Sequence, residues 1–69
     1  MSNNMTITAK YRAYLRNNQG CVFDACNFAN LRSLRDWARD RGGIYELIIE
    51  TRNGSEITYV VKNNRIMSN

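Results

Sequence analysis

The segment that decides the fold spans residues 27–41 and reads NFANLRSLRDWARDR. It is the only stretch in which apolar residues recur with a helical period over a length sufficient to cover a sheet. At about 100° per residue, Leu31, Leu34 and Ala38 fall on one narrow stripe, with aromatic residues on either side. We therefore predict one helix that buries this stripe against the rest of the chain.

Both ends of the predicted helix carry boundary signals. Asn27 can serve as the N-cap, because its short side chain can accept a hydrogen bond from a backbone N–H group of the first turn. Gly42 and Gly43 supply the left-handed conformation that commonly ends helices. The helix is therefore expected to run from Asn27 to Arg41.

The exposed face of this helix is patterned by charge. Arg32, Arg35 and Arg39 recur at i, i+3 and i+7 and form one ridge, while Asp36 and Asp40 form a separate acidic stripe beside it. The guanidinium groups of the ridge could bind carboxylates or phosphates bidentately. Alternatively, these residues form ordinary surface ion pairs, and both interpretations stay open.

The residues before the helix predict a hairpin. Residues 5–16 alternate strictly between apolar and polar types, which is typical of a half-buried strand. A second strand over residues 21–25 is expected to turn Cys21, Phe23 and Ala25 inward. The outward row of the first strand combines basic residues with one aromatic residue: Lys10, Arg12, Tyr14 and Arg16. Such a row resembles a platform for single-stranded nucleic acid, although a solvated sheet face is the favoured interpretation.

The residues after the helix predict a second hairpin, with strands over residues 44–51 and 56–62. A two-residue turn would place the two apolar sets on opposite faces, so we predict a three-residue loop, 52–54, with Gly54 left-handed. This register opposes Glu50 to Glu56 and turns Ile48 and Val60 outward. Asn63 and Asn64 mark a further turn, after which residues 65–67 form a short edge strand.

Together these segments predict an α+β fold of order ββαββ(β), an antiparallel sheet with one helix packed on one face. Residues 1–69 are expected to form a single small domain and a monomer. Its predicted core consists of Ile7, Tyr11, Phe23, Leu31, Leu34, Leu47, Ile49, Ile57 and Tyr59.

Composition limits the function classes. Hydrophobic residues make up 43% and charged residues 23% of the 69 residues, which is typical of a folded domain. The net charge of +4 favours an acidic partner or nucleic acid, although it also serves solubility. No apolar run is long enough for a signal peptide or a membrane span, so a cytoplasmic protein is expected.

Neither a metal site nor catalysis is expected. Cys21 and Cys26 would lie roughly 16 Å apart on an extended strand, too far for a disulfide. Without histidine the two thiols cannot complete a zinc site, and no cofactor motif is present. Asp36 and Asp40 are expected on the solvated helix face rather than in a catalytic pair. The sequence therefore favours a protein that acts by binding, not an enzyme.

The segment 48–59, IIETRNGSEITY, follows a helix and precedes a turn with a short strand. In order and length this arrangement resembles small phage-encoded anti-CRISPR proteins, in particular an inhibitor of the type I-F surveillance complex that carries an E-T-x-N-G hairpin. The resemblance implies inhibition without catalysis, by occupying the groove in which a host CRISPR-Cas effector holds nucleic acid. Arg32 is the one helix position that it carries over, and Trp37 departs from the pattern.

The expected partner-binding residues are therefore the helix ridge Arg32, Arg35 and Arg39 and the strand row Lys10, Arg12, Tyr14 and Arg16. The alternative functions are a small basic nucleic-acid-binding accessory protein and a small regulatory subunit.

Overall fold

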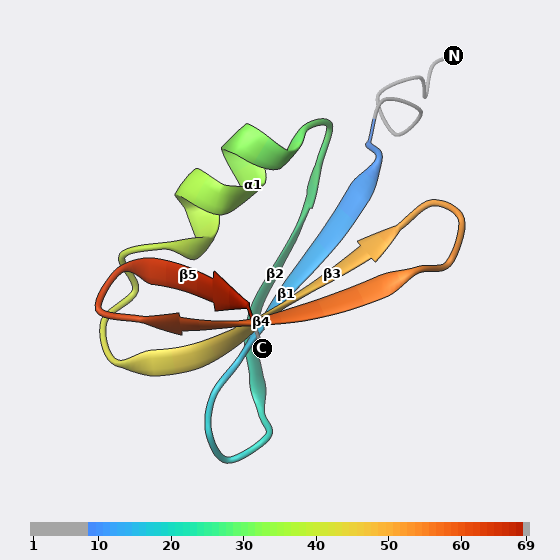
Figure 1. Ribbon diagram of the computed structural model, residues 1–69. Coiled ribbons are helices and arrows are strands. Elements are labelled where there is room, and N and C mark those ends of the chain that lie inside the picture. The colour runs from blue at the N-terminus through green and yellow to red at the C-terminus, as the bar shows by residue number, and fades with distance from the viewer. Residues whose placement is uncertain (1–8, 69) are drawn as a thin grey trace.

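The structure is a computed structural model that describes residues 9–68, and in this range five strands form one antiparallel sheet with one helix on it (Figure 1). The elements are β1 (Tyr11–Arg16), β2 (Val22–Phe28), α1 (Leu31–Ala38), β3 (Ile44–Thr51), β4 (Glu56–Lys62) and β5 (Arg65–Ser68). The spatial order of the strands is β2-β1-β3-β4-β5. The predicted α+β class is confirmed.

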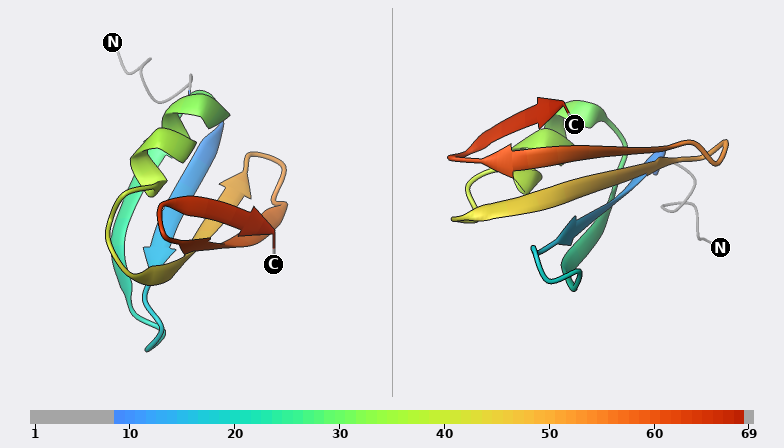
Figure 2. Two further views of the ribbon diagram at one scale, coloured as in Figure 1. Left: turned by 60° about the vertical axis from the view of Figure 1, so that its left-hand side comes forward. Right: turned by 60° about the horizontal axis from the view of Figure 1, so that its bottom comes forward.

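The helix covers only one end of this sheet. It packs against β1 and β2, and the two views of Figure 2 show the loop of the β3–β4 hairpin extending beyond it. An aromatic contact attaches the helix to the edge strand, because the rings of Phe28 and Trp37 lie 5.2 Å apart between centroids. The helix side of β4 is consequently left partly exposed.

The core lies between the helix and the middle strands. It consists of Ala13, Leu15, Leu34, Ala38, Tyr45, Leu47, Ile49 and Val61. The predicted burial of Leu34, Leu47 and Ile49 is confirmed, and Tyr11 and Tyr59 pack half-buried against the cluster. Ala38, which the sequence placed on the buried stripe of the helix, and Ala13 on β1 are also fully buried.

Three predicted core residues are exposed instead. Phe23, Leu31 and Ile57 retain 47%, 44% and 46% of their accessible surface. Leu31 is the first residue of the helix, and Ile57 lies on β4, away from the strands against which the helix packs. Phe23 lies where the pairing of β2 with β1 shifts register, and it keeps an edge contact with the ring of Tyr45. Ile7, the remaining predicted core residue, and the other residues of the expected first strand before Ala9 lie outside the described range.

The predicted start of the helix is wrong. Asn27 belongs to β2, which continues to Phe28, opposite Tyr11. Asn30 is the actual N-cap, and its Oδ1 accepts a hydrogen bond from the backbone N–H of Ser33 at 2.9 Å. Cross-strand hydrogen bonds to β1 hold the earlier asparagine in an extended conformation, so the second asparagine of the segment takes the capping role.

Replacing Asn30 by alanine should lower the free energy of unfolding by about 1 kcal/mol, because the cap hydrogen bond is lost. Asn27→Ala is the matched control. It removes an exposed hydrogen bond from Arg12 and should have a smaller effect. Chemical denaturation of both variants measures the difference, and a larger loss for the Asn27 variant would contradict the assigned cap.

The predicted end of the helix is also wrong. The last helical residue is Ala38, and Arg39 follows it in an extended conformation with φ −81° and ψ 167°. Asp40 adopts the left-handed conformation at φ 66°, ahead of the glycine pair at 42–43. The glycines therefore shape the loop to β3 and do not cap the helix.

The phase of the second strand differs from the prediction. Ala25 lies opposite Tyr14 and Cys26 opposite Ala13, so Cys26 and not Ala25 faces the helix. Cys21 precedes β2 and is exposed. A register shift near the end of β1 displaces the pairing by one residue, which alternation alone does not reveal. Both cysteines are free thiols.

The second hairpin has the predicted register. Its pairs include Ile49 with Ile57, Leu47 with Tyr59 and Tyr45 with Val61. Gly54 has a φ of 93°, and the N–H of Thr51 donates to the carbonyl of Ser55 at 2.9 Å, which closes the three-residue loop. Glu50 lies opposite Glu56 as predicted.

The short final strand is confirmed as β5, which pairs with β4. Asn63 and Asn64 have φ values of 53° and 61°, so both turn residues are left-handed. Two left-handed residues define the tight turn that matches the twist of a hairpin, and asparagine tolerates this conformation well.

Candidate binding surfaces

The outer face of the sheet carries its own counter-charges. Arg16 forms an ion pair with Glu46 at 2.7 Å between Nη2 and Oε1. The Tyr14 hydroxyl donates to Glu50 at 3.0 Å, and Arg12 Nε donates to that hydroxyl at 3.1 Å. The register makes this neutralisation possible, because it sets Arg16 opposite Glu46 and Arg12 opposite Glu50. Each of these three predicted residues is therefore hydrogen-bonded to a neighbouring side chain, which leaves less basic surface available than the sequence suggested.

The predicted exposure of Ile48 on this outer face is wrong. Only 7% of its surface is accessible, because it lies between Tyr14 and Thr58 on the neighbouring strands. Val60 is half-buried. The outer face therefore does not present the apolar centre that the alternation indicated.

The helix ridge is shorter than predicted. Arg39 lies beyond the helix, and its Nη2 is 2.7 Å from Oδ1 of Asp36, so the expected surface ion pair is present. Asp40 likewise lies outside the helix. Arg32 and Arg35 remain on α1, and neither forms an ion pair within residues 9–68.

Arg41, which the sequence did not single out, joins the helix to the sheet edge. Its Nη1 forms an ion pair with Oδ2 of Asp24 at 2.8 Å, and its Nε donates to the carbonyl of Trp37 at 3.0 Å. The hydrogen bond from Arg41 holds the pKa of Asp24 below its ordinary value. Tyr45 completes the helix end, since its hydroxyl donates to the Ala38 carbonyl at 2.6 Å. This arginine therefore has a structural role.

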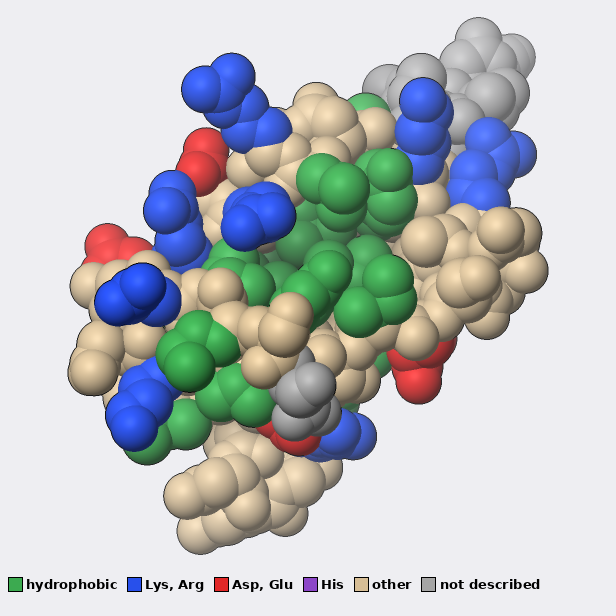
Figure 3. All heavy atoms as spheres, in the orientation of Figure 1, with side chains coloured by type: hydrophobic (Ala, Val, Ile, Leu, Met, Phe, Trp, Pro, Cys, Tyr) green, Lys and Arg blue, Asp and Glu red, His purple; other side chains and the backbone are tan. Residues whose placement is uncertain are grey.

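An apolar surface lies on the helix side of the sheet, where the helix leaves β4 uncovered. We define it by Tyr11, Leu31, Ile57 and Tyr59, of which Leu31 and Ile57 are 44% and 46% exposed. Ile57 and Tyr59 are alternate residues of β4 and so point to the same face. Figure 3 shows hydrophobic side chains gathered at the middle of this face with lysine and arginine side chains around them. Exposed apolar area with a charged rim is typical of a protein-binding surface.

A basic hollow of about 320 Å³ lies at one end of the apolar surface. Its walls are Lys10, Tyr11, Thr51, Arg52 and Asn53. Neither Lys10 nor Arg52 forms an ion pair with any residue that the structure describes. Tyr11 belongs both to this basic hollow and to the apolar surface, so the two are continuous.

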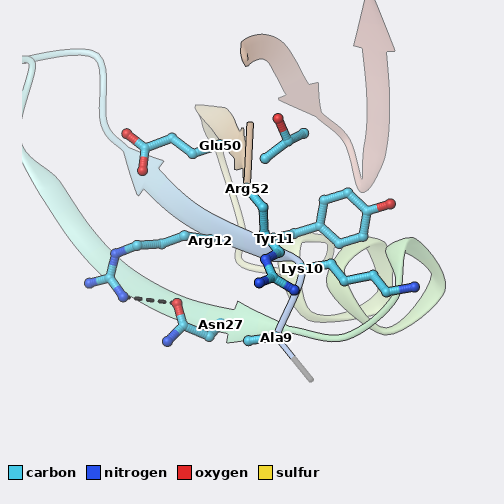
Figure 4. A pocket seen from close by; sticks show the side chains of 8 residues that line it. Ala9, Lys10, Tyr11, Arg12, Asn27, Glu50 and Arg52 are labelled. Carbon is cyan, nitrogen blue, oxygen red and sulfur yellow. Dashed lines mark hydrogen bonds between the residues drawn. The ribbon is translucent and has the colours of Figure 1, made fainter. Parts of the chain in front are cut away.

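A neighbouring hollow shares part of these walls and adds Arg12, Asn27 and Glu50. In Figure 4, Arg12 and Asn27 lie on the left with Glu50 above them, whereas Arg52 lies at the centre and Lys10 extends to the right. Lys10 was expected in the outer strand row, but it precedes β1 and lines the basic hollow. Arg52 was expected only as a turn residue. Its position at a hairpin tip, next to the exposed ends of the strands, was the sequence signal that could have indicated a binding role.

Comparison of the chain with protein-family models, with curated proteins and with solved structures found no match. Within residues 9–68, no helix has the length and apolar character needed to cross a membrane. In the same range, no group of three or more histidine, cysteine, aspartate or glutamate side chains is placed to hold a metal ion.

Proposed function

We propose that the chain is a non-catalytic binding protein that inhibits a CRISPR-Cas effector complex in the host cytoplasm by covering its nucleic-acid-binding surface. The resemblance of residues 48–59 to anti-CRISPR proteins supplies the receptor class. The observation that carries the binding role is the pair of exposed apolar side chains, Leu31 and Ile57, next to cations without ion pairs.

The charge of the chain bears on how such inhibition would work. A net charge of +4 is opposite to that of nucleic acid, so the protein would not act as a mimic of DNA or RNA in a basic groove. It would dock on an apolar and acidic patch of a protein subunit next to the groove and block nucleic acid sterically. The apolar surface would form the centre of that contact, where binding energy concentrates.

The alternative is a small basic nucleic-acid-binding accessory protein. The three ion pairs among residues 9–68 leave most cationic side chains without an acidic partner, which favours phosphate binding. The acidic partners of Arg16 and Tyr14 on the outer face count against this alternative. A contact centred on Leu31 and Ile57 requires a protein partner instead.

Titration of a purified effector complex, with target-DNA binding as the readout, tests the proposal. Occlusion predicts that inhibition saturates at a fixed ratio of at least one protein per complex and persists when salt is raised from about 50 to 200 mM, because an apolar contact does not release counterions. The nucleic-acid alternative predicts a loss of binding of roughly tenfold or more over this range. Inhibition well below one protein per complex, or equal binding to naked DNA, would contradict occlusion.

A further inference from the structure

We infer that the basic hollow receives a carboxylate from a partner segment in which an acidic residue stands next to apolar residues. The acidic side chain would lie between Lys10 and Arg52 while its apolar neighbours cover Leu31 and Ile57. This inference rests on the proposed function and names the chemistry of the partner at that same surface.

The charge of the basic hollow favours an anionic group. Lys10 and Arg52 line one hollow from different strand ends, and neither has an ion-pair partner within residues 9–68. Glu50 lines the neighbouring hollow, and it accepts a hydrogen bond from Tyr14 on the outer face. Figure 4 shows its side chain directed away from Lys10 and Arg52. Two cations therefore face the hollow without a carboxylate between them.

Hydrogen bonds hold the backbone that carries these two cations. Arg52 follows Thr51, whose carbonyl accepts from the N–H of Gly54 at 3.1 Å, and Asn53 Oδ1 accepts from the N–H of Ser55 at 3.1 Å. The N–H of Lys10 donates to the carbonyl of Phe28 at 2.9 Å. Both side chains thus start from fixed points, which lowers the entropy lost when they close on a ligand.

The basic hollow is continuous with the apolar surface. Tyr11 forms a wall of the basic hollow, lies opposite Thr51 and also belongs to the apolar surface. A ligand that filled only the hollow would leave Leu31 and Ile57 exposed. A nucleic-acid strand would place further phosphates or bases over these aliphatic side chains, whereas a peptide segment can set leucine-like residues on them. The occupant is therefore a protein segment with mixed acidic and apolar character.

Nuclear magnetic resonance titration with two acetylated tetrapeptide amides, Leu-Glu-Leu-Leu and Leu-Gln-Leu-Leu, tests the inference. The glutamate peptide should bind about threefold to tenfold more tightly at low salt, since its carboxylate forms charge-assisted hydrogen bonds. It should shift the backbone amides of Tyr11 and Arg52 and the Nε–H signal of Arg52. Equal affinities, or no measurable binding of either peptide, overturn the inference.

The double variant Lys10→Gln with Arg52→Gln should abolish the preference for the glutamate peptide. The matched control is Lys62→Gln with Arg65→Gln, which removes two other cations without ion pairs in the described range and should leave the preference unchanged. Spectra of the unliganded variants check the fold, and Arg52→Gln alone replaces the double variant if that variant is unfolded. A preference that survives in the hollow variant, or falls equally in the control, overturns the inference.

A third arm uses an oligothymidine in place of the peptides. If it shifts the Lys10 and Arg52 signals more strongly than the glutamate peptide does, the hollow binds phosphate and the inference is wrong. The peptide arms contain no effector complex, so their failure is separate from that of the proposed function. A kept peptide preference without effector inhibition rejects only the proposed receptor, and inhibition without a peptide preference rejects only the inference.

Discussion

Replacing Leu47 by alanine is expected to lower the free energy of unfolding by about 2 to 5 kcal/mol. Leu47 is fully buried on β3, the middle strand of the sheet, between Leu15 on β1 and Tyr59 on β4. The substitution removes apolar contacts and leaves a cavity that strands held on both sides cannot close. The free energy of unfolding of native proteins is about 5 to 15 kcal/mol, and small domains lie at the lower end of this range. The variant should therefore be close to unfolding.

Urea denaturation followed by circular dichroism measures this loss. The matched control is Ile57→Ala, which also truncates a branched aliphatic side chain within the β3–β4 hairpin. Ile57 is 46% exposed, so its loss should be below about 1 kcal/mol. Similar losses for the two variants would show that the β4 end of the sheet is covered in solution, which would also contradict the apolar surface.

Replacing both Leu31 and Ile57 by glutamine is expected to weaken binding to an effector complex by about 30-fold or more. The apolar surface is the proposed centre of the interface, and truncating central residues typically costs at least about 2 kcal/mol of binding free energy. Both side chains are largely exposed in the unbound protein, so the fold should persist. The dissociation constant measured by competition with target DNA reports the effect.

The control for this variant is Val22→Gln with Met67→Gln. These side chains are 53% and 46% exposed and pair with Arg16 and Val60, which places them on the outer face of the sheet. The control should bind as tightly as the unaltered chain. Equal weakening by both variants would mean that exposed apolar area anywhere on the protein contributes, and no weakening by either would remove the apolar surface as the site.

Local patterns in the sequence were enough to predict the β3–β4 hairpin. Two-residue periodicity assigned a face to each residue of both strands, and only a three-residue loop with Gly54 left-handed brought the two apolar sets together. The observed register agrees, including the opposed Glu50 and Glu56. Short-range constraints decide such a hairpin because its register depends on the turn and on nearest neighbours.

The helix boundaries depended on longer-range contacts. Asn27 and Asn30 are both competent N-caps by residue type, and pairing of β2 with β1 as far as Phe28 selects the second. At the other end, Arg41 and Tyr45 satisfy carbonyls of the last turn through side chains that arrive from beyond the helix. The predicted ridge of three arginines loses Arg39 for the same reason. Arg39 can share the helical period with Arg32 and Arg35 only if the helix extends to it, and the helix ends at Ala38.

The candidate binding residues divide in the same way. By itself the sequence determined the α+β class, an excess of basic residues and which strand residues alternate, since these follow from composition and local period. Only the tertiary structure decided which charges are neutralised, because Arg16 meets Glu46 across the β1–β3 ladder, 30 residues apart in the chain. It also decided that Leu31 and Ile57 are exposed and that Lys10 and Arg52 line one hollow, since both depend on where a short helix comes to rest on a twisted sheet.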